Sequence, residues 1–244
     1  MKITRQIATT ETVVCNVKDI HPVGTYGCLR VDGMSDGEIS AHVQSSCDEL
    51  SERDGGYSTY VTVTSIGATR SITIDINIPK GVNITFENVK VVHSTITGED
   101  GSSVYFRKCA DTHDVTINGV TVNVDRSMCR VTLNNCHVSG HGRIVDSTFY
   151  QCEFIGSLEL DNCVGATNFR GGNEDRLCIA YAAEHNLMIR AGCFSGDTTE
   201  FAEAVRERYD DLPVGDNYIV SMMIAVASVV NKLKVIDKSK QDRV

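Results

Sequence analysis

The residues that most resemble a catalytic motif lie near the start of the chain, at positions 33–37, Gly-Met-Ser-Asp-Gly. This order matches the Gly-x-Ser-x-Gly turn that exposes a nucleophilic serine between a strand and a helix in α/β hydrolases. Ser35 can equally cap a following helix, with Glu38 three residues later completing a capping box. A hydrolase sheet needs several strands before this turn, and only about 30 residues precede it. We therefore expect no enzyme, with Ser35 as the residual candidate nucleophile.

A second possible chemistry is metal binding by a group of cysteines and histidines: Cys129, Cys136, His137 and His141. Structural zinc sites usually take paired ligands from a tight Cys-x2-Cys knuckle, which this group lacks. If Cys136 points into a core, its neighbour His137 must point outward, so the two are poorly placed to share an ion. We predict no metal and no other cofactor. The remaining central histidines are interpreted as isolated surface residues: His42, His93 and His113.

Acidic pairs indicate a third possible chemistry, the cleavage of glycosidic bonds by two carboxyl groups. The pairs are Asp111 with Asp114, Glu99 with Asp100, and Glu159 with Asp161. Polysaccharide-cleaving enzymes generally need a long groove with aromatic platforms. This chain has no Trp and only 6% aromatic residues, so we do not expect this activity.

Charge narrows the possible partners. The net charge is −9, whereas nucleic-acid binding needs a basic excess that neutralises phosphates, so direct nucleic-acid binding is not expected. Candidate residues for an anionic small ligand, such as a nucleotide signal, are Arg143, Arg170 and Arg190. Candidate residues for a protein partner lie on an acidic helix: Glu200, Glu203 and Glu207. A charge run of this kind is also typical of a solvated helix face.

The elements that would carry these residues are indicated by a five-residue pattern in the middle of the chain. Its copies start at residues 85, 105, 116, 132, 148 and 159, with spacings of 20, 11, 16, 16 and 11. The second position is always large and apolar, the fifth is always Val or Cys, and the fourth is Asn in three copies. Irregular spacing with a constant internal pattern is typical of successive turns of a parallel β-solenoid, whose strands stack about 4.8 Å apart.

Stacking of these turns would align each inward position into one column. The second positions predict an apolar column: Phe86, Phe106, Ile117, Leu133, Phe149 and Leu160. The fifth positions predict a column of small residues: Val89, Cys109, Val120, Cys136, Cys152 and Cys163. Free cysteines are commonly buried as small apolar residues, so we interpret these four thiols as structural core. Asn before them favours a left-handed bend at each corner.

Part of this stretch, residues 147–171, resembles the pentapeptide-repeat family. The resemblance rests on three units with a central Phe: Ser-Thr-Phe-Tyr-Gln at 147–151, Cys-Glu-Phe-Ile-Gly at 152–156 and Thr-Asn-Phe-Arg-Gly at 167–171. In that family the central Leu or Phe faces inward, and a small residue stands two positions earlier. Residues 157–166 break the pattern. The resemblance implies a right-handed coil for this stretch.

The predicted fold is mainly β: a parallel β-solenoid over residues 57–172, between a small α/β cap at 1–56 and a hairpin with two helices at 173–244. Within the cap, residues 38–50 place four apolar side chains on one helical face: Ile39, Val43, Cys47 and Leu50. A solenoid needs such caps because an open end exposes unpaired strand edges.

The C-terminal segment is predicted to contain two helices. The first begins after Asp197, which forms a capping box with Glu200, and ends at about Tyr209. The second runs from about Asp216 to Lys234 and is apolar nearly all round, so it must be buried on several sides. The hairpin and the first helix are too small to cover it, so a homodimer contact is expected.

Residues 189–201, Ile-Arg-Ala-Gly-Cys-Phe-Ser-Gly-Asp-Thr-Thr-Glu-Phe, open a segment of about 50 residues that resembles the C-terminal modules of small bacteriophage proteins. Those modules often follow irregular β-repeats. The resemblance implies a phage or prophage origin and the cytoplasm of a host bacterium. It supplies no catalytic residues.

These observations predict a non-enzymatic binding protein that inhibits or sequesters a host factor, in an anti-defence or host-takeover role. The alternatives are a binder of a small nucleotide signal and a structural component of the virion. No uninterrupted apolar run reaches the ~18 residues of a membrane span, and no apolar signal core follows Met1 to Gln6. We therefore expect no membrane partner and a cytoplasmic location.

Overall fold

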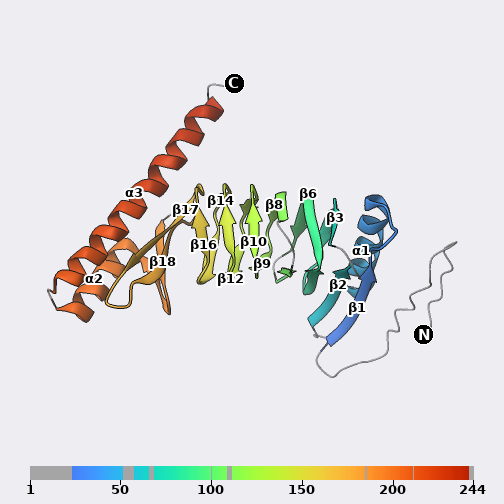
Figure 1. The fold of residues 1–244 in the computed structure, drawn as a ribbon, viewed down its shortest axis with the longest axis horizontal. Coiled ribbons are helices and arrows are strands. Elements are labelled where there is room, and N and C mark those ends of the chain that lie inside the picture. Colours follow the sequence, from blue (N-terminus) through green and yellow to red (C-terminus); the bar gives the residue numbers. More distant parts are fainter. Residues whose placement is uncertain are drawn as a thin grey trace. The chain divides into compact units, whose positions relative to one another are not determined.

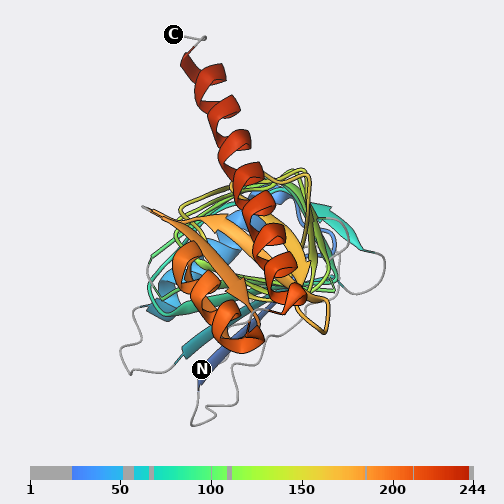
Figure 2. The same cartoon turned by 90° about the vertical axis from the view of Figure 1, so that its left-hand side faces the viewer.

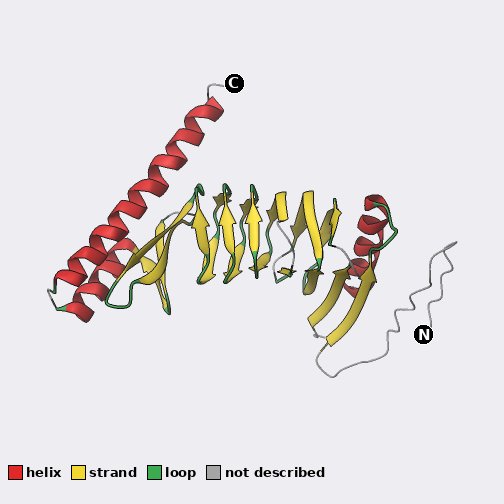
Figure 3. Cartoon of the chain, in the orientation of Figure 1, coloured by secondary structure: helices red, strands yellow, loops and turns green. Residues whose placement is uncertain are grey.

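The computed structural model describes residues 24–51, 58–65, 69–99, 101–108, 112–184, 186–210 and 212–241. It confirms the predicted fold class, since 49% of the chain is strand and parallel sheets form a β-solenoid of about five turns. The described helices occur near the two ends of the chain, and strands occupy its middle (Figures 1 and 3). The chain forms two compact units, which divide after Ser127.

The first unit contains one helix among the described residues, α1 (Asp36–Ser51). Its strands are β1 (Gly24–Arg30), β2 (Ser58–Thr64), β3 (Arg70–Ile72), β4 (Asp75–Ile78), β5 (Val82–Glu87), β6 (Val89–Gly98), β7 (Ser103–Arg107), β8 (Thr112–Asn118) and β9 (Thr121–Val124). Strands β1, β2, β5, β7 and β9 are parallel neighbours in that order, and β6 pairs with β3, β4 and β8. Strand β10 (Ser127–Cys129) begins at the boundary.

Parallel pairing aligns apolar residues into buried columns inside the first unit. Strands β2, β5, β7 and β9 supply one column: Val61, Ile84, Val104 and Val122. Strands β4, β6 and β8 supply another: Ile76, Ile96 and Ile117. The rings of Phe86 and Phe106 stack with centroids 5.5 Å apart. Side-chain period two thus places one face of each strand in the coil interior.

Helix α1 closes an end of the first unit and packs against β1, β2, β4 and β5 (Figure 1). The predicted helical face is confirmed, because its four apolar residues are buried: Ile39, Val43, Cys47 and Leu50. The guanidinium of Arg70 donates to the carbonyls of Val31 and Met34, which ties β3 to the loop before the helix. The helix therefore shields apolar coil interior from water.

The second unit carries regular turns of 16 residues. Its strands in the coil are β11 (Thr132–Asn134), β12 (His137–Gly140), β13 (Arg143–Val145), β14 (Thr148–Tyr150), β15 (Glu153–Gly156) and β16 (Glu159–Asp161). Pairing joins β11 to β14, β12 to β15 and β13 to β16, each time between residues 16 apart in sequence. One turn therefore has three strands, and residues 143–158 form one complete turn.

The predicted left-handed bends are confirmed at the corners of these turns. Residues there have φ near +50°: Asn135, Asp146, Gln151 and Asn162. The side chains that follow the bends point inward, as expected, and Cys136, Cys152 and Cys163 are buried. Cys109 lies outside the described residues. The burial predicted for the thiols is therefore confirmed for three of them.

The prediction of one continuous column for all six pattern copies was wrong. Cys136 and Cys152 follow the paired strands β11 and β14, but Cys163 follows β16, whose partner is β13. By this register the residue next to Cys163 in its column is Ser147. The spacing of 16 is a full turn, whereas the spacing of 11 between residues 148 and 159 is a step from one side of the coil to another. The same pattern therefore marks corners on different sides.

The second unit ends in an antiparallel sheet with two helices. The sheet contains β17 (Ala166–Gly171), β18 (Arg176–Ala182), β19 (Leu187–Ala191) and β20 (Phe194–Asp197), in that order. The predicted hairpin is confirmed as β18 and β19. Helices α2 (Thr198–Tyr209) and α3 (Pro213–Gln241) pack together on this sheet, and the C-terminal part of α3 extends past it (Figure 2).

The helix boundaries agree with the prediction at α2 and differ at α3. Asp197 and Glu200 form the predicted capping box, and α2 ends at Tyr209. Helix α3 begins three residues earlier than predicted, because Pro213 is suited to the first turn of a helix, where its missing N–H is not needed. The ring of Tyr218 lies directly over Gly171, where a Cβ atom would be 2.0 Å from the ring. This close approach anchors the start of α3 on β17.

Candidate functional site

Ser35, the candidate nucleophile, is held by the helix that follows it. Its backbone N–H donates to Oε2 of Glu38 at 2.8 Å, and its Oγ lies 2.8 Å from the same oxygen. In return the backbone N–H of Glu38 donates to Oγ of Ser35 at 3.3 Å. These hydrogen bonds lower the pKa of the Glu38 carboxyl group. The alternative interpretation, a capping box at the start of α1, is confirmed.

Of the cysteines and histidines considered for zinc, Cys136 and His137 differ in burial as predicted. Cys136 is buried and its Sγ donates to the carbonyl of Asn134, while exposed His137 lies 3.2 Å from Oε2 of Glu153. A hydrogen bond with Cys136, together with burial, raises the pKa of the Cys152 thiol. Burial raises the pKa of the Cys163 thiol to about 11. Protonated thiols are poor nucleophiles and poor metal ligands, which agrees with a structural role.

The three candidate arginines occupy different strands. Arg143 on β13 forms an ion pair with Asp161 at 2.7 Å, and Arg170 on β17 pairs with Asp175 at 3.5 Å. Arg190 on β19 is half-buried, and its Nε atom is buried without a hydrogen-bond partner among the described residues. Of the acidic candidates, Glu203 and Glu207 are exposed on α2, and Glu200 belongs to the capping box.

A cavity of about 190 Å³ lies in the C-terminal module, beside the start of α3. Its lining includes two cations, Arg176 and Arg208, together with Tyr209 and Tyr218. None of the arginines chosen from the sequence is among its lining residues. Sequence reasoning missed Arg176 and Arg208, because nothing in their local spacing indicates that β18 and α2 contribute to one cavity.

Helix α3 has one buried face and one exposed apolar face. The buried face packs on the sheet and α2 through Tyr218, Met222, Ala225 and Val229. On the other face, Val220, Met223 and Ile224 have 52%, 61% and 67% of their surface exposed. Isolated exposed apolar residues are common, but three on adjacent turns form a patch that is typical of an interface.

The length and composition of this helix would also suit a membrane span. Within residues 213–234, the most apolar window of 18 residues has a mean hydropathy of 1.4, and 28% of that window is buried. A core helix of a soluble protein can have the same length and composition, although such a helix is mostly buried. The expectation of no membrane partner therefore stays a prediction.

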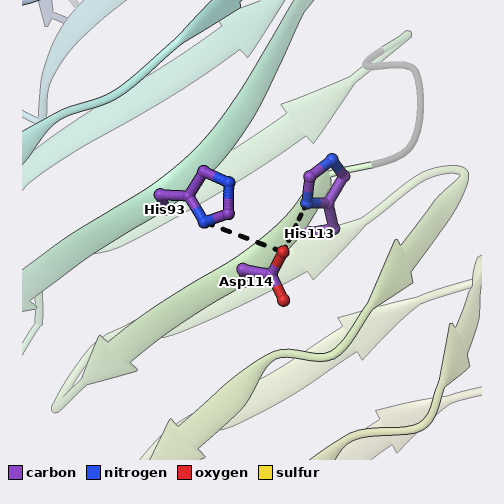
Figure 4. Close-up of side chains that lie close together, drawn as sticks. All are labelled: His93, His113 and Asp114. Atoms are coloured by element: carbon purple, nitrogen blue, oxygen red, sulfur yellow. Dashed lines mark hydrogen bonds and ion pairs between the residues drawn. The ribbon is translucent and has the colours of Figure 1, made fainter.

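A cluster that sequence reasoning missed lies on the first unit. His93 on β6 and His113 and Asp114 on β8 lie together (Figure 4), whereas the sequence led us to treat both histidines as isolated. The pairing of β6 with β8 places them side by side, because Val92 aligns with His113. A known turn length of 21 residues would have revealed this proximity.

Comparisons with family models, with curated proteins and with solved structures found no match.

Proposed function

We propose that this chain is a non-enzymatic binding protein that forms a dimer through the exposed face of α3 and presents its solenoid surface to a protein of a host bacterium. The observation that carries the proposal is the apolar patch on α3, opposite the face that packs on the sheet. Covering this patch would remove apolar surface from water, which is the main driving force of protein association.

The spacing along the exposed face favours a second copy of the chain as the occupant. Six positions along this face are separated alternately by four and three residues, as in a coiled-coil seam: Asp216, Val220, Met223, Ala227, Val230 and Lys234, of which Val230 is half-buried and the others are exposed. We refer to these six residues as the α3 seam. Its two ends carry opposite charges, and the four residues between them are all apolar.

The α3 seam is complementary to itself in an antiparallel arrangement. A two-fold interface uses the same patch on both copies, so self-complementarity is its requirement. Opposite charges at the ends would favour the antiparallel orientation over the parallel one. In the middle, a large side chain would meet a small one, which lets facing layers interdigitate. The facing pairs in a dimer centred at residue 225 would be Asp216 with Lys234, Val220 with Val230, and Met223 with Ala227.

The test is the mass of the full chain in solution, measured by light scattering and analytical ultracentrifugation. We expect a dimer for the wild type and at least a tenfold weaker dimer for Met223→Glu, which places a charge in the seam. Leu212→Glu is the matched control, because Leu212 is 54% exposed but lies outside the seam. Lys234→Asp should weaken the dimer, and adding Asp216→Lys should restore it.

Two outcomes would contradict the proposal that a second copy of the chain covers the α3 seam. The first is a wild-type chain that stays monomeric at 100-micromolar concentration. The second is a chain that is recovered with membranes and needs detergent, which would assign the patch to lipid. Failure of the charge swap to restore a dimer lost in Lys234→Asp would contradict the antiparallel arrangement.

The solenoid surface supports the second part of the proposal. Outward side chains on the strands of the second unit are mostly polar and held by pairs across turns, such as His137 with Glu153 and Arg143 with Asp161. Repeat proteins use the extended surfaces formed by their stacked turns for recognition. The resemblance of the C-terminal segment to phage modules suggests a host protein as the target, and hence an anti-defence role.

Capture from a bacterial lysate tests the target. We expect a host protein to be recovered with the wild type and with Met223→Glu. Its recovery should fall at least tenfold with Arg143→Glu, which reverses a charge on the solenoid. Recovery of the chain alone, or equal recovery with all three proteins, would contradict binding through the solenoid.

A further inference from the structure

We propose that His93, His113 and Asp114 form a site for a divalent transition-metal ion such as Zn²⁺. The Nδ1 atom of His113 lies 2.8 Å from Oδ2 of Asp114, and Nδ1 of His93 lies 3.7 Å from the same oxygen (Figure 4). One potential ligand atom from each of the three residues lies within 4.8 Å of the others. Among the described residues, three donors of the metal-binding types converge here.

These separations suit a tetrahedral ion. Zinc binds nitrogen and carboxylate oxygen at about 2.0–2.2 Å, so two ligands of a tetrahedral site lie about 3.4 Å apart. The two measured separations from Oδ2, 2.8 and 3.7 Å, fall on either side of that value. Small side-chain rotations, chiefly of exposed His93, would bring all three donors to bonding distance. Imidazole nitrogen with one carboxylate selects zinc, nickel or copper over calcium or magnesium.

The solenoid backbone positions the three donors. Strands β6 and β8 are parallel neighbours, with Val92 aligned to His113 and Ser94 to Val115, so His93 lies opposite Asp114. His93 and Asp114 both have left-handed backbone, with φ of 47° and 55°. Each is therefore a corner residue whose side chain is presented outward from the coil.

The surroundings keep this corner in place. The Oγ of buried Ser94 donates to the carbonyl of Val92 at 2.7 Å and accepts from the backbone N–H of Ile74 at 2.9 Å. Val91 and Val115 are buried on either side of the corner. A donor set on a rigid, hydrogen-bonded frame loses little freedom when an ion binds, which favours affinity.

The site would leave coordination positions open to solvent. His93 is 67% exposed at its side chain, and His113 and Asp114 are 23% and 30% exposed. Three protein ligands would leave the fourth position of a tetrahedral ion for water or a ligand atom from a partner. Because His93 and Asp114 come from successive turns, a bound ion would also cross-link β6 and β8.

Calorimetric titration of the full, reduced chain with Zn²⁺ tests the proposal. We expect one ion per chain at this site, with affinity at least tenfold lower in His93→Asn and in His113→Gln. Asn is chosen at position 93 because it tolerates left-handed backbone, so the fold is retained while the imidazole is lost. The matched control is His137→Gln, which removes an exposed imidazole from a pair with Glu153 that offers only two donors.

A second readout separates this site from the ten cysteines. Co²⁺ bound by imidazole and carboxylate should give visible ligand-field bands without the near-ultraviolet thiolate charge-transfer band, and these bands should be lost in Asp114→Asn. Circular dichroism checks that each variant is folded. Absence of binding, binding of equal strength in His93→Asn, or a thiolate charge-transfer band would each overturn the proposal.

Discussion

The residue that precedes each inward corner position has left-handed backbone, whatever its type. The fourth position of the five-residue pattern has φ between 50° and 72° in all six copies: Asn88, Lys108, Gly119, Asn135, Gln151 and Asn162. Asn in three copies made this bend predictable, because Asn tolerates left-handed backbone better than most residues. Lys108 and Gln151 show that the coil imposes the conformation even on residues that disfavour it.

This strain can be measured at Gln151, which is exposed and has φ of 52°. We expect Gln151→Val to lower the free energy of unfolding by about 1–2 kcal/mol, because a β-branched side chain is strongly disfavoured at positive φ. Gln151→Gly is the control: it removes the same amide but suits the bend, so stability should change little. Urea unfolding of both variants gives the comparison, and equal stability would contradict imposed strain at this corner.

At the scale of elements, the buried face of each helix was predicted more accurately than its ends. The face of α1 and the capping box of α2 lie where the sequence placed them. The inner stripe of α3 is also buried, through Tyr218, Met222, Ala225 and Val229. The sequence of α3 does not show what packs against its outer face. Its periodicity shows which residues are apolar, but not how many neighbouring elements surround the helix.

The sequence predicted that these segments are strands, but not which side of the coil each strand occupies. The alternation of apolar and polar residues shows which side chains face inward. It does not distinguish the sides of a three-sided turn, since every side uses the same alternation. This ambiguity led to the wrong placement of Cys163 in the same column as Cys136 and Cys152.

At the scale of the whole molecule, turn length differs between the two units. Stacked residues in the second unit are 16 apart in sequence, whereas those in the first unit are 23, 20 and 18 apart along β2, β5, β7 and β9. Constant turn length makes each turn of the second unit equivalent to its neighbour. In such repeats each turn contacts mainly the turns beside it, so stability is approximately a sum over turns.

Because the turns of the second unit are equivalent, we expect the fold to tolerate the insertion of an additional turn. We expect a chain with a second copy of residues 143–158 inserted after Leu158 to unfold cooperatively, with a Tm within a few degrees of the wild type. The added turn supplies three strands that can pair with the identical strands of the original turn on one side, and on the other side it presents the same strands to β16 that the original turn presents in the wild type. Thermal unfolding followed by circular dichroism is the measurement.

The control is insertion of a second copy of residues 143–150 alone. Half a turn places strands over corners and breaks the register of everything that follows, so this chain should lose cooperative unfolding. Equal loss of structure in both insertions would mean that the 16-residue turn is not an independent unit.

The sequence by itself determined the class of fold, the inward face of each strand, the corner conformation and the helix stripes. These features depend on side-chain period and on the preferences of single residues, which are local. Of the candidate sites, it identified the capping role of Ser35 and the apolar character of the last helix.

Only the tertiary structure decided which residues lie beside one another in successive turns. It placed Cys163 with Ser147, His93 opposite Asp114, and Arg176 near Arg208 at one cavity. The reason is physical: from β2 onward, parallel pairing aligns residues 16 to 23 positions apart in sequence, and the loops that set each distance vary in length. Local patterns therefore specify what faces inward, but not which neighbour it meets.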